Sequence, residues 1–362
     1  MSPPVNAIAH PRRDLCRPIR VDDTTHVGEA RRLAASLCRD LDFGAPRIGQ
    51  AALIVTELAT NLFRHTAGAG GELVFRAIEE AGATGMDILS LDRGPGIANI
   101  GESLRDGCST ANSSGTGLGA IRRASSVFDV FSALGKGTVL FSRLWKGSPP
   151  ALPPDAPPAL CVGAVCVPAR GEQACGDAWS MQAGGQAQGT TTFMLADGLG
   201  HGPDAAAAAD LAVAIFKRHA LKSPAELVSL IHAGLKGTRG AAVAVAELPG
   251  APPAARVVRF AGVGNIAGLM LCGKSWKNLS SFPGTAGLEA RKIQEFCYPW
   301  PEGGMLVLHS DGISGRWSLD DYPGLAHKHP ALIAGVLFRD HQRPRDDSTV
   351  LVAMESGRRD GP

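Results

Sequence analysis

Aromatic residues are scarce in this chain, and long apolar runs are absent from it. Aromatic side chains make up 5% of the 362 residues, although hydrophobic residues of all kinds reach 44%, which is enough for packed cores. No apolar run is long enough to span a bilayer, and the first residues carry no signal-peptide pattern. We therefore expect a cytoplasmic protein with no membrane partner.

Neither sign of charge dominates, because 36 Lys and Arg stand against 34 Asp and Glu, for a formal net charge of +2. The chain lacks the basic excess that nucleic-acid-binding proteins usually carry. Its eight cysteines include no CxxC pair, and several lie in apolar segments. We expect reduced thiols, and neither a disulfide framework nor a zinc site.

A proline-rich segment divides the chain. Residues 147–158 read GSPPALPPDAPP, a composition typical of an extended, semi-rigid spacer. It separates two sets of motifs, one within residues 1–146 and the other within residues 159–355. The last residues, 356–362, are predicted to form a mobile tail. A length of 362 residues also favours two domains.

Four short acidic motifs lie far apart in the second part of the chain. Each places an aspartate beside glycine or at a strand end, and the aspartates are Asp177, Asp197, Asp311 and Asp346. Hard divalent cations need several carboxylate oxygens at one site, and glycine lets the backbone add a carbonyl. A single Asp-Gly pair is more often a turn. Four such loops together predict two metal ions with a nucleophilic water between them, a recurrent solution for phosphoester hydrolysis.

The order and flanks of these motifs resemble the metal-dependent protein phosphatases (PPM family), specifically the SpoIIE/RsbX branch. The resemblance covers about residues 159–355 and includes RGAAV at 239–243, FAGVGNI at 260–266, LHSDGI at 308–313 and RDDSTV at 345–350. It implies an α/β/β/α sandwich that hydrolyses phosphoserine or phosphothreonine with Mg²⁺ or Mn²⁺. Many Val- and Leu-rich segments and two helix-like segments in this part agree with a sandwich.

The resemblance also implies a role for each residue of the metal site. Asp197 would bridge both metals and serve catalysis, and Gly198 would lend its carbonyl. Asp311 and Asp346 would hold one metal, and Asp177 would complete the site. Larger members of the family grip the substrate phosphate with an arginine, and the motifs of this chain do not place one.

The first part of the chain carries a different pattern. A helix is predicted over residues 46–66, PRIGQAALIVTELATNLFRHT, because apolar residues recur at helical spacing and Pro46 suits a first turn. Glu57 and Asn61 are four residues apart and therefore share a face of this helix. Such a pair could place a general base beside a magnesium ligand, although on most helices it is merely solvated.

Two glycine-rich segments follow this helix. DRGPGI begins at Asp92, after the strand-like MDILSL, and GTGLG at 115–119 precedes AIRRASSVFDVF, which we predict to be a helix. Glycines let backbone amides approach phosphates, and a helix N-terminus favours anions. An aspartate after a strand can accept a hydrogen bond from an adenine amino group. The βαβ order of a Rossmann fingerprint is missing.

This ordered set, with GKGT at 135–138, resembles the GHKL ATPase fold over about residues 18–146. It is most similar to the anti-sigma-factor serine kinases and their RsbT relatives. The resemblance implies a two-layer α/β sandwich, with helices on one face of a mixed sheet, that binds ATP. By resemblance, Glu57 is the general base and Asn61 the Mg²⁺ ligand. The nucleotide-binding residues that it implies are Asp92, Gly94, Gly96, Gly115, Gly117, Gly119 and Thr138.

Together the resemblances imply an α+β protein that acts as a bifunctional partner-switching regulator. An ATP-dependent Ser/Thr kinase module and a phosphatase would both act on STAS-domain proteins of the anti-anti-sigma or stressosome type. Two alternatives stay open. The first domain could be an ATP-binding sensor or docking module that controls its phosphatase partner without kinase activity. The protein could also be an anti-sigma factor that sequesters a sigma factor.

Overall fold

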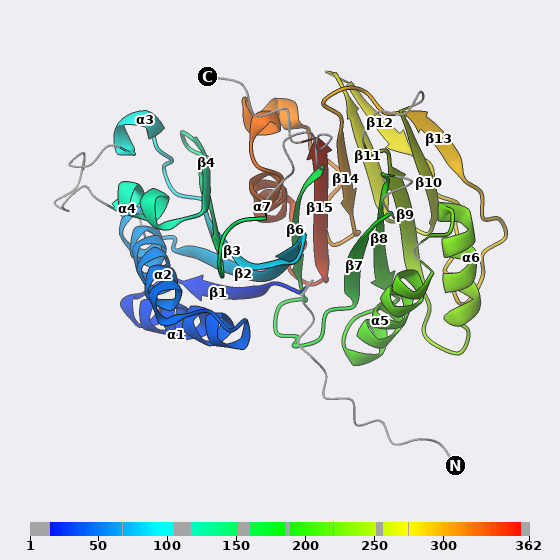
Figure 1. Cartoon of the computed structure of the whole chain (residues 1–362), viewed down its shortest axis with the longest axis horizontal. Coiled ribbons are helices and arrows are strands. Elements are labelled where there is room, and N and C mark those ends of the chain that lie inside the picture. The colour runs from blue at the N-terminus through cyan, green and yellow to red at the C-terminus, as the bar shows by residue number, and fades with distance from the viewer. Residues whose placement is uncertain are drawn as a thin grey trace, which may run out of the picture.

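The computed structural model describes residues 15–66, 68–104, 117–150, 160–184, 189–219, 221–250, 256–273 and 275–355. Most of the expected spacer, the expected tail and Gly115 lie outside these residues. The described chain forms three five-stranded sheets with helices between and around them (Figure 1). None of its helices combines the length and the apolar character needed to cross a membrane.

The first domain is a two-layer α/β sandwich. Its sheet has the order β1-β2-β3-β5-β4, and every pair of neighbours is antiparallel, so the expectation of a mixed sheet was wrong. The elements are β1 (Arg17–Val21), α1 (Thr24–Asp40), α2 (Ala45–His65), β2 (Gly71–Glu80), β3 (Ala83–Asp92), α3 (Ile100–Ser103), α4 (Gly117–Ala124), β4 (Val127–Ala133) and β5 (Gly137–Trp145).

Local sequence explains most of these elements. Helix α2 has a proline in its first turn and buries Ile54, Val55, Leu58 and Leu62 on one face, as its periodicity predicted. The helix expected over AIRRASSVFDVF is wrong in its second half. It stops at Ala124, and the rest forms strand β4, because β-branched and aromatic residues there pair with β5.

The second domain packs two antiparallel sheets face to face. Their strand orders are β13-β10-β9-β8-β7 and β12-β11-β14-β15-β6, and α5 and α6 cover the outer face of the former sheet. The elements are β6 (Leu160–Val167), β7 (Asp177–Ala183), β8 (Thr191–Gly198), α5 (Pro203–Arg218), α6 (Pro224–Gly234), β9 (Ala241–Leu248), β10 (Val257–Val263), β11 (Ala267–Cys272), β12 (Ser275–Leu279), β13 (Phe296–Pro299), β14 (Met305–His309), the 3₁₀ turns Leu319–Asp321 and Leu325–His327, α7 (Pro330–His341) and β15 (Ser348–Glu355).

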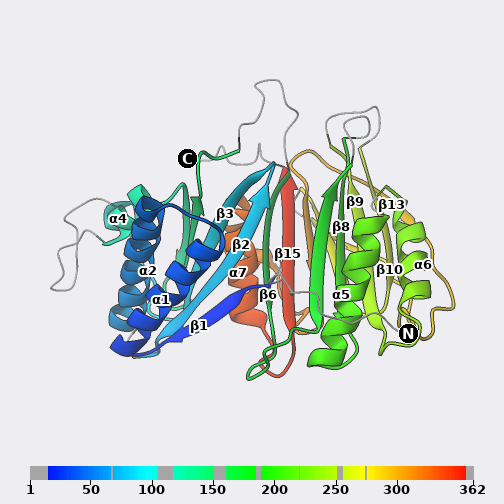
Figure 2. The same ribbon diagram turned by 60° about the horizontal axis from the view of Figure 1, so that its bottom comes forward.

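Helix α7 lies between the two domains. Its residues 330–339 are all buried, which is typical of a helix packed on both sides. It contacts β6 and β15 of the second domain and β3, β4 and β5 of the first (Figure 2). Leu89 and Phe141 of the first domain share one core cluster with Leu337 of α7 and with Val165 and Val350. The domains therefore form one continuous stack of layers, with helix α7 completing the α/β/β/α sandwich.

Candidate functional site

The four motif aspartates of the second domain gather at one end of its two sheets. Asp177 begins β7 and stands directly opposite Asp197 on β8. Asp311 follows β14, and Asp346 precedes β15, which pairs with β14 in antiparallel register. Because the end of one antiparallel strand meets the start of its neighbour, both loops leave the sheet on the same side.

Hydrogen bonds join the two sheets at this end. Ser310 donates to Asp177 Oδ2 at 2.6 Å, and the backbone N–H of Thr349 donates to Ser310 Oγ at 3.0 Å. Asn265, which lies beyond β10, donates through Nδ2 to Asp311 Oδ2 at 2.7 Å. Asp177 has 0% exposure, so the site reaches from the protein interior at Asp177 to the surface at Asp311.

The carboxylates of this cluster repel one another in a buried setting. Burial first, and then the charges of Asp177 and Asp311, raise the pKa of Asp197 to about 9. Burial also raises the pKa of Asp177 to about 7, against the hydrogen bond from Ser310. The pKa of Asp346 is raised by burial and by the charge of Asp311. A divalent cation would relieve this repulsion.

The side chains do not adopt a coordinating arrangement as they stand. Within the described ranges, no group of three or more His, Cys, Asp and Glu side chains is arranged to hold a metal ion. The donor set nevertheless fits a hard cation, because it consists of carboxylate oxygens beside backbone carbonyls. Gly198 packs closely against α5, since a Cβ at this position would stand 2.2 Å from the Ala205 carbonyl oxygen.

The two adjacent aspartates of the last motif differ in what they bind. Both oxygens of Asp347 accept backbone N–H groups, from Ala169 at 2.8 Å and Gly176 at 2.9 Å. Asp347 therefore anchors the segment that leads into Asp177. Asp346 instead shares a side-chain hydrogen bond with Asp311, and its Oδ1 accepts the N–H of the adjacent Asp347 at 3.0 Å. This difference favours Asp346 over Asp347 as a metal ligand.

Two arginines to which the sequence motifs assigned no role lie beside the acidic loops. A cavity of about 390 Å³ is lined by Arg170, Glu172, His201 and Arg345, with Ala169 and Pro344. His201 follows the Asp197 motif and bonds through Nδ1 to Glu172 at 3.0 Å. Arg345 directly precedes Asp346, which is the signal that could have identified it. These guanidinium groups suit a phosphate oxygen.

In the first domain, Glu57 and Asn61 of α2 meet the start of α4. A Cβ at Gly117 would lie 3.0 Å from Glu57 Oε2 and 3.8 Å from Asn61 Oδ1. The glycine thus lets the helix N-terminus approach both side chains. Gly119 is buried in the same helix, whereas Gly115 lies outside the described residues.

Asp92 organises the other side of this nucleotide-binding face. Its Oδ1 accepts the N–H groups of Gly94 at 2.7 Å and Thr138 at 3.1 Å, which joins the DRGPGI and GKGT segments. Burial raises its pKa, and the two N–H donors oppose that effect. Gly96 has φ +80°, and a Cβ there would stand 2.3 Å from the Ala133 carbonyl oxygen. Asp92, Gly94, Gly96 and Thr138 therefore lie together.

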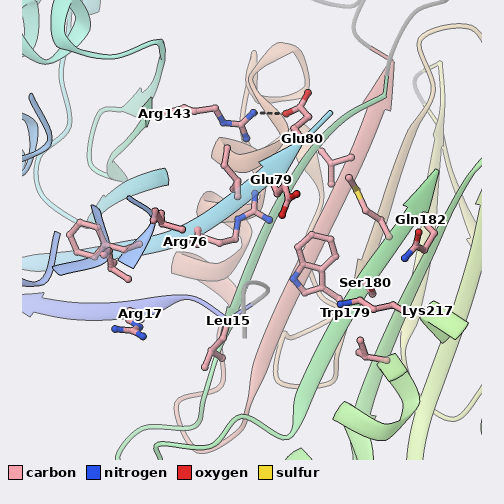
Figure 3. A pocket seen from close by; sticks show the side chains of 18 of the residues that line it. Leu15, Arg17, Arg76, Glu79, Glu80, Arg143, Trp179, Ser180, Gln182 and Lys217 are labelled. Atoms are coloured by element: carbon pink, nitrogen blue, oxygen red, sulfur yellow. Dashed lines mark hydrogen bonds and ion pairs between the residues drawn. The ribbon is translucent and has the colours of Figure 1, made fainter. Parts of the chain in front are cut away.

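A cavity of about 960 Å³ lies elsewhere, between β2 of the first domain and β7 and α5 of the second (Figure 3). Arg76 stacks over the Trp179 ring at 5.5 Å on its wall, and Arg143 pairs with Glu80 at 3.1 Å. No residue of either predicted site lines it. Cavity size is therefore no guide to the chemistry of this protein.

Comparisons with known proteins match both parts of the chain. A family model described as "Histidine kinase-like ATPase domain" matches residues 19–142, and one described as "Stage II sporulation protein E (SpoIIE)" matches residues 187–354. The serine/threonine-protein kinase RsbT of Bacillus subtilis (strain 168) is 29% identical over 127 residues, which cover 35% of this chain and 94% of RsbT.

Two solved structures are also similar. A chain of a structure described as "The bacterial stressosome: a modular system that has been adapted to control secondary messenger signaling" is 29% identical, with a TM-score of 0.48 over 54% of this chain and 99% of that chain. A PP2C phosphatase domain with a regulatory fragment of SpoIIE from Bacillus subtilis is 16% identical, with a TM-score of 0.45 over 92% of this chain and 96% of that chain. The two family matches and the RsbT relative support a kinase-like ATPase domain fused to a SpoIIE-type PPM phosphatase domain.

Proposed function

We propose that this partner-switching regulator dephosphorylates serine or threonine on a STAS-domain protein and phosphorylates the same class of protein with ATP. The observation that carries the phosphatase half is the cluster of buried, mutually repelling aspartates at the meeting point of the two sheets. Such a cluster is costly without a cation, and structural ion pairs do not explain it, because the charges acting most on Asp197 are all those of aspartates.

Asp197, Asp311 and Asp346, with the carbonyl of Gly198, would hold Mg²⁺ or Mn²⁺. A bound metal pair supplies the Lewis acidity and the activated water that phosphoester hydrolysis requires. Ser310 orients Asp177 through the 2.6 Å bond, and Asn265 orients Asp311. Arg170 and Arg345 would hold the phosphate of the substrate at the mouth of the site.

In the first domain, Glu57 would accept the proton of a substrate hydroxyl, and Asn61 would hold Mg²⁺ against the phosphates. Both side chains lie beside the N-terminus of α4, which favours anions. Asp92 Oδ2 would accept a hydrogen bond from the adenine amino group, while Oδ1 accepts the N–H groups of Gly94 and Thr138. The likeness to RsbT, which is named a serine/threonine kinase, supports transfer rather than hydrolysis alone.

The test uses the intact chain and a purified STAS-domain protein. With labelled ATP, we expect the label to appear on a serine or threonine of that protein, and to be released again when Mn²⁺ is supplied. Glu57→Gln removes the basic oxygen but keeps the shape, so it is expected to block labelling only. If no STAS-domain protein gains or loses phosphate, the proposed substrate class is wrong.

One observation favours a second candidate, in which the first domain senses ATP and controls the phosphatase. The face of its sheet opposite α1 and α2 is covered by α7 of the phosphatase domain. Under this alternative, ATP changes phosphatase activity although no phosphate is transferred. Labelling by the parent chain but not by Glu57→Gln would exclude it. A direct complex with a sigma factor would instead favour the anti-sigma alternative.

A further inference from the structure

The C-terminal turn of α7 touches the loop that carries Asp92. Arg339 Nη1 donates to the Asp92 carbonyl oxygen at 2.9 Å, and Arg93 donates back to the Arg339 carbonyl oxygen. The Arg339 side chain is 4% exposed, so this contact is shielded from water. A residue of the phosphatase domain therefore fixes the backbone of the loop that would bind adenine.

The same turn of α7 runs directly into the loops of the carboxylate cluster. Ser314 N–H donates to the His341 carbonyl at 2.8 Å, and Arg343 N–H donates to the Gly312 carbonyl at 2.7 Å. Asp346 N–H then donates to the Arg343 carbonyl at 3.1 Å. The loops that carry Asp311 and Asp346 thus take their positions from the end of α7.

Side chains lock this turn into one arrangement. Arg339 donates to both oxygens of Asp340, at 2.8 and 2.7 Å, and Tyr322 donates to Asp340 at 3.0 Å. The Tyr322 hydroxyl also lies 3.0 Å from His341 Nε2. A packed, charge-compensated network changes between discrete arrangements and does not deform smoothly. A shift of the Asp92 backbone would therefore be transmitted to the loops of Asp311 and Asp346.

We propose that Arg339 is a positioning residue for the nucleotide, and that nucleotide and cation bind with positive coupling through the C-terminal turn of α7. The proposal rests on the proposed nucleotide and metal sites. Each ligand would order the one helix turn that both loops share, so the second ligand meets a loop already in place. Such coupling is reciprocal, and it typically amounts to roughly 5- to 150-fold in affinity.

The test is a double-mutant cycle read out as nucleotide affinity in the intact chain. The dissociation constant of a fluorescent ADP analogue is measured at a fixed free Mg²⁺ concentration that saturates the nucleotide. Asp311→Asn disables only the distant cation site, and we expect it to weaken nucleotide binding by about fivefold or more. Asp346→Asn repeats the measurement if Asp311→Asn fails to fold.

Arg93→Ala is the variant that weakens the route, because it removes one of the two side-chain bonds between the Asp92 loop and the end of α7. Its side chain is 65% exposed, so the fold should survive, and the bond to the α7 terminus is lost. In this background, Asp311→Asn is expected to weaken nucleotide binding less than it does in the parent. Lys328→Ala is the matched control, because it breaks another interdomain ion pair, with Asp129 at 3.2 Å, at the opposite end of α7. In the Lys328→Ala background, Asp311→Asn should weaken nucleotide binding as much as it does in the parent.

Three results would overturn the proposal. An unchanged affinity in Asp311→Asn, within twofold, excludes coupling even if the parent binds nucleotide and has metal-dependent phosphatase activity. In that case the proposed function stands and only the coupling fails. Equal behaviour of the Arg93 and Lys328 variants excludes the route through the end of α7. If the parent binds no nucleotide, the proposed nucleotide site and the coupling both fail.

Discussion

Replacing Asp87 by asparagine should destabilise the sheet that carries the Asp92 loop. Asp87 lies on β3 between Arg76 on β2 and Arg143 on β5, and all three are buried. Arg143 donates to its two oxygens at 2.6 and 3.0 Å, and Arg76 donates at 2.8 Å. Asparagine removes the negative charge and leaves two buried guanidinium groups without it.

The size of the effect follows from the pKa. Burial alone would raise the pKa of Asp87, but Arg143 and Arg76 outweigh burial and lower it from 3.8 to about 2. At 1.36 kcal/mol per tenfold change in proton affinity, this corresponds to about 2 kcal/mol of stability at neutral pH. Removing one member of a buried ion pair costs about 3–5 kcal/mol. We therefore expect a loss of about 2–5 kcal/mol.

The sign of the pH dependence is fixed by the lowered pKa. The stabilisation by Asp87 is fully present above the unfolded-state value of 3.8 and is lost as the pH falls toward about 2. The Asp87→Asn variant lacks this titrating carboxyl group. Its free energy of unfolding should therefore fall less steeply with decreasing pH in this range than that of the parent. Asp22→Asn is the control, because Asp22 pairs with Arg20 at 3.3 Å on the surface and should matter little.

The assay is urea unfolding of both variants and the parent at pH 7 and at several values between pH 4 and pH 2. A loss below about 1 kcal/mol in Asp87→Asn at pH 7 would refute the account of this buried triad. So would an identical acid slope in Asp87→Asn and the parent.

Three further predictions concern the two sites. Glu57→Gln should keep ATP affinity and lose phosphoryl transfer, measured by nucleotide titration and by labelling of a STAS-domain protein; equal labelling would remove Glu57 as the base. Gly137→Ala should weaken nucleotide binding, because Gly137 has φ +82° and a Cβ would stand 2.2 Å from the Asp92 carbonyl oxygen. Gly135→Ala, at φ +74° with nothing within 4 Å of the Cβ, is its control, and an equal loss in both would contradict the steric argument. Arg170→Ala and Arg345→Ala should each raise KM for a phosphoserine substrate about tenfold, as expected for a charged hydrogen bond of about 1.5 kcal/mol; an unchanged KM in both would exclude phosphate binding there.

Segments whose apolar residues recur regularly on one face could be predicted from the sequence. Helix α2 follows its apolar spacing, and α6 begins with a Ser223 cap followed by Pro224, both of which are helix-start signals. The likeness of both motif sets to known families also gave the fold class of each domain.

The elements that could not be predicted lack an apolar face confined to one side. Helix α7, PALIAGVLFRDH, is apolar all round, because it packs on a sheet from each domain. Strand β4 was predicted as helix, since its pairing with β5 is not visible in local sequence. The pairing of Arg339 with the Asp92 backbone spans 247 residues and depends on how the domains pack. Arg170 likewise reaches its cavity through the fold and has no motif of its own.

The most direct test of the central claim is phosphate release from a phosphoserine-containing STAS-domain protein by the intact chain, with and without EDTA. The account predicts that release requires Mn²⁺ or Mg²⁺, stops on chelation and falls by several orders of magnitude in Asp311→Asn, because metal activation of water is the main catalytic contribution. Asp347→Asn is a poor substitute for this variant, since Asp347 holds backbone groups and its loss would disturb folding. Undiminished phosphate release in EDTA, or by Asp311→Asn, would contradict the account.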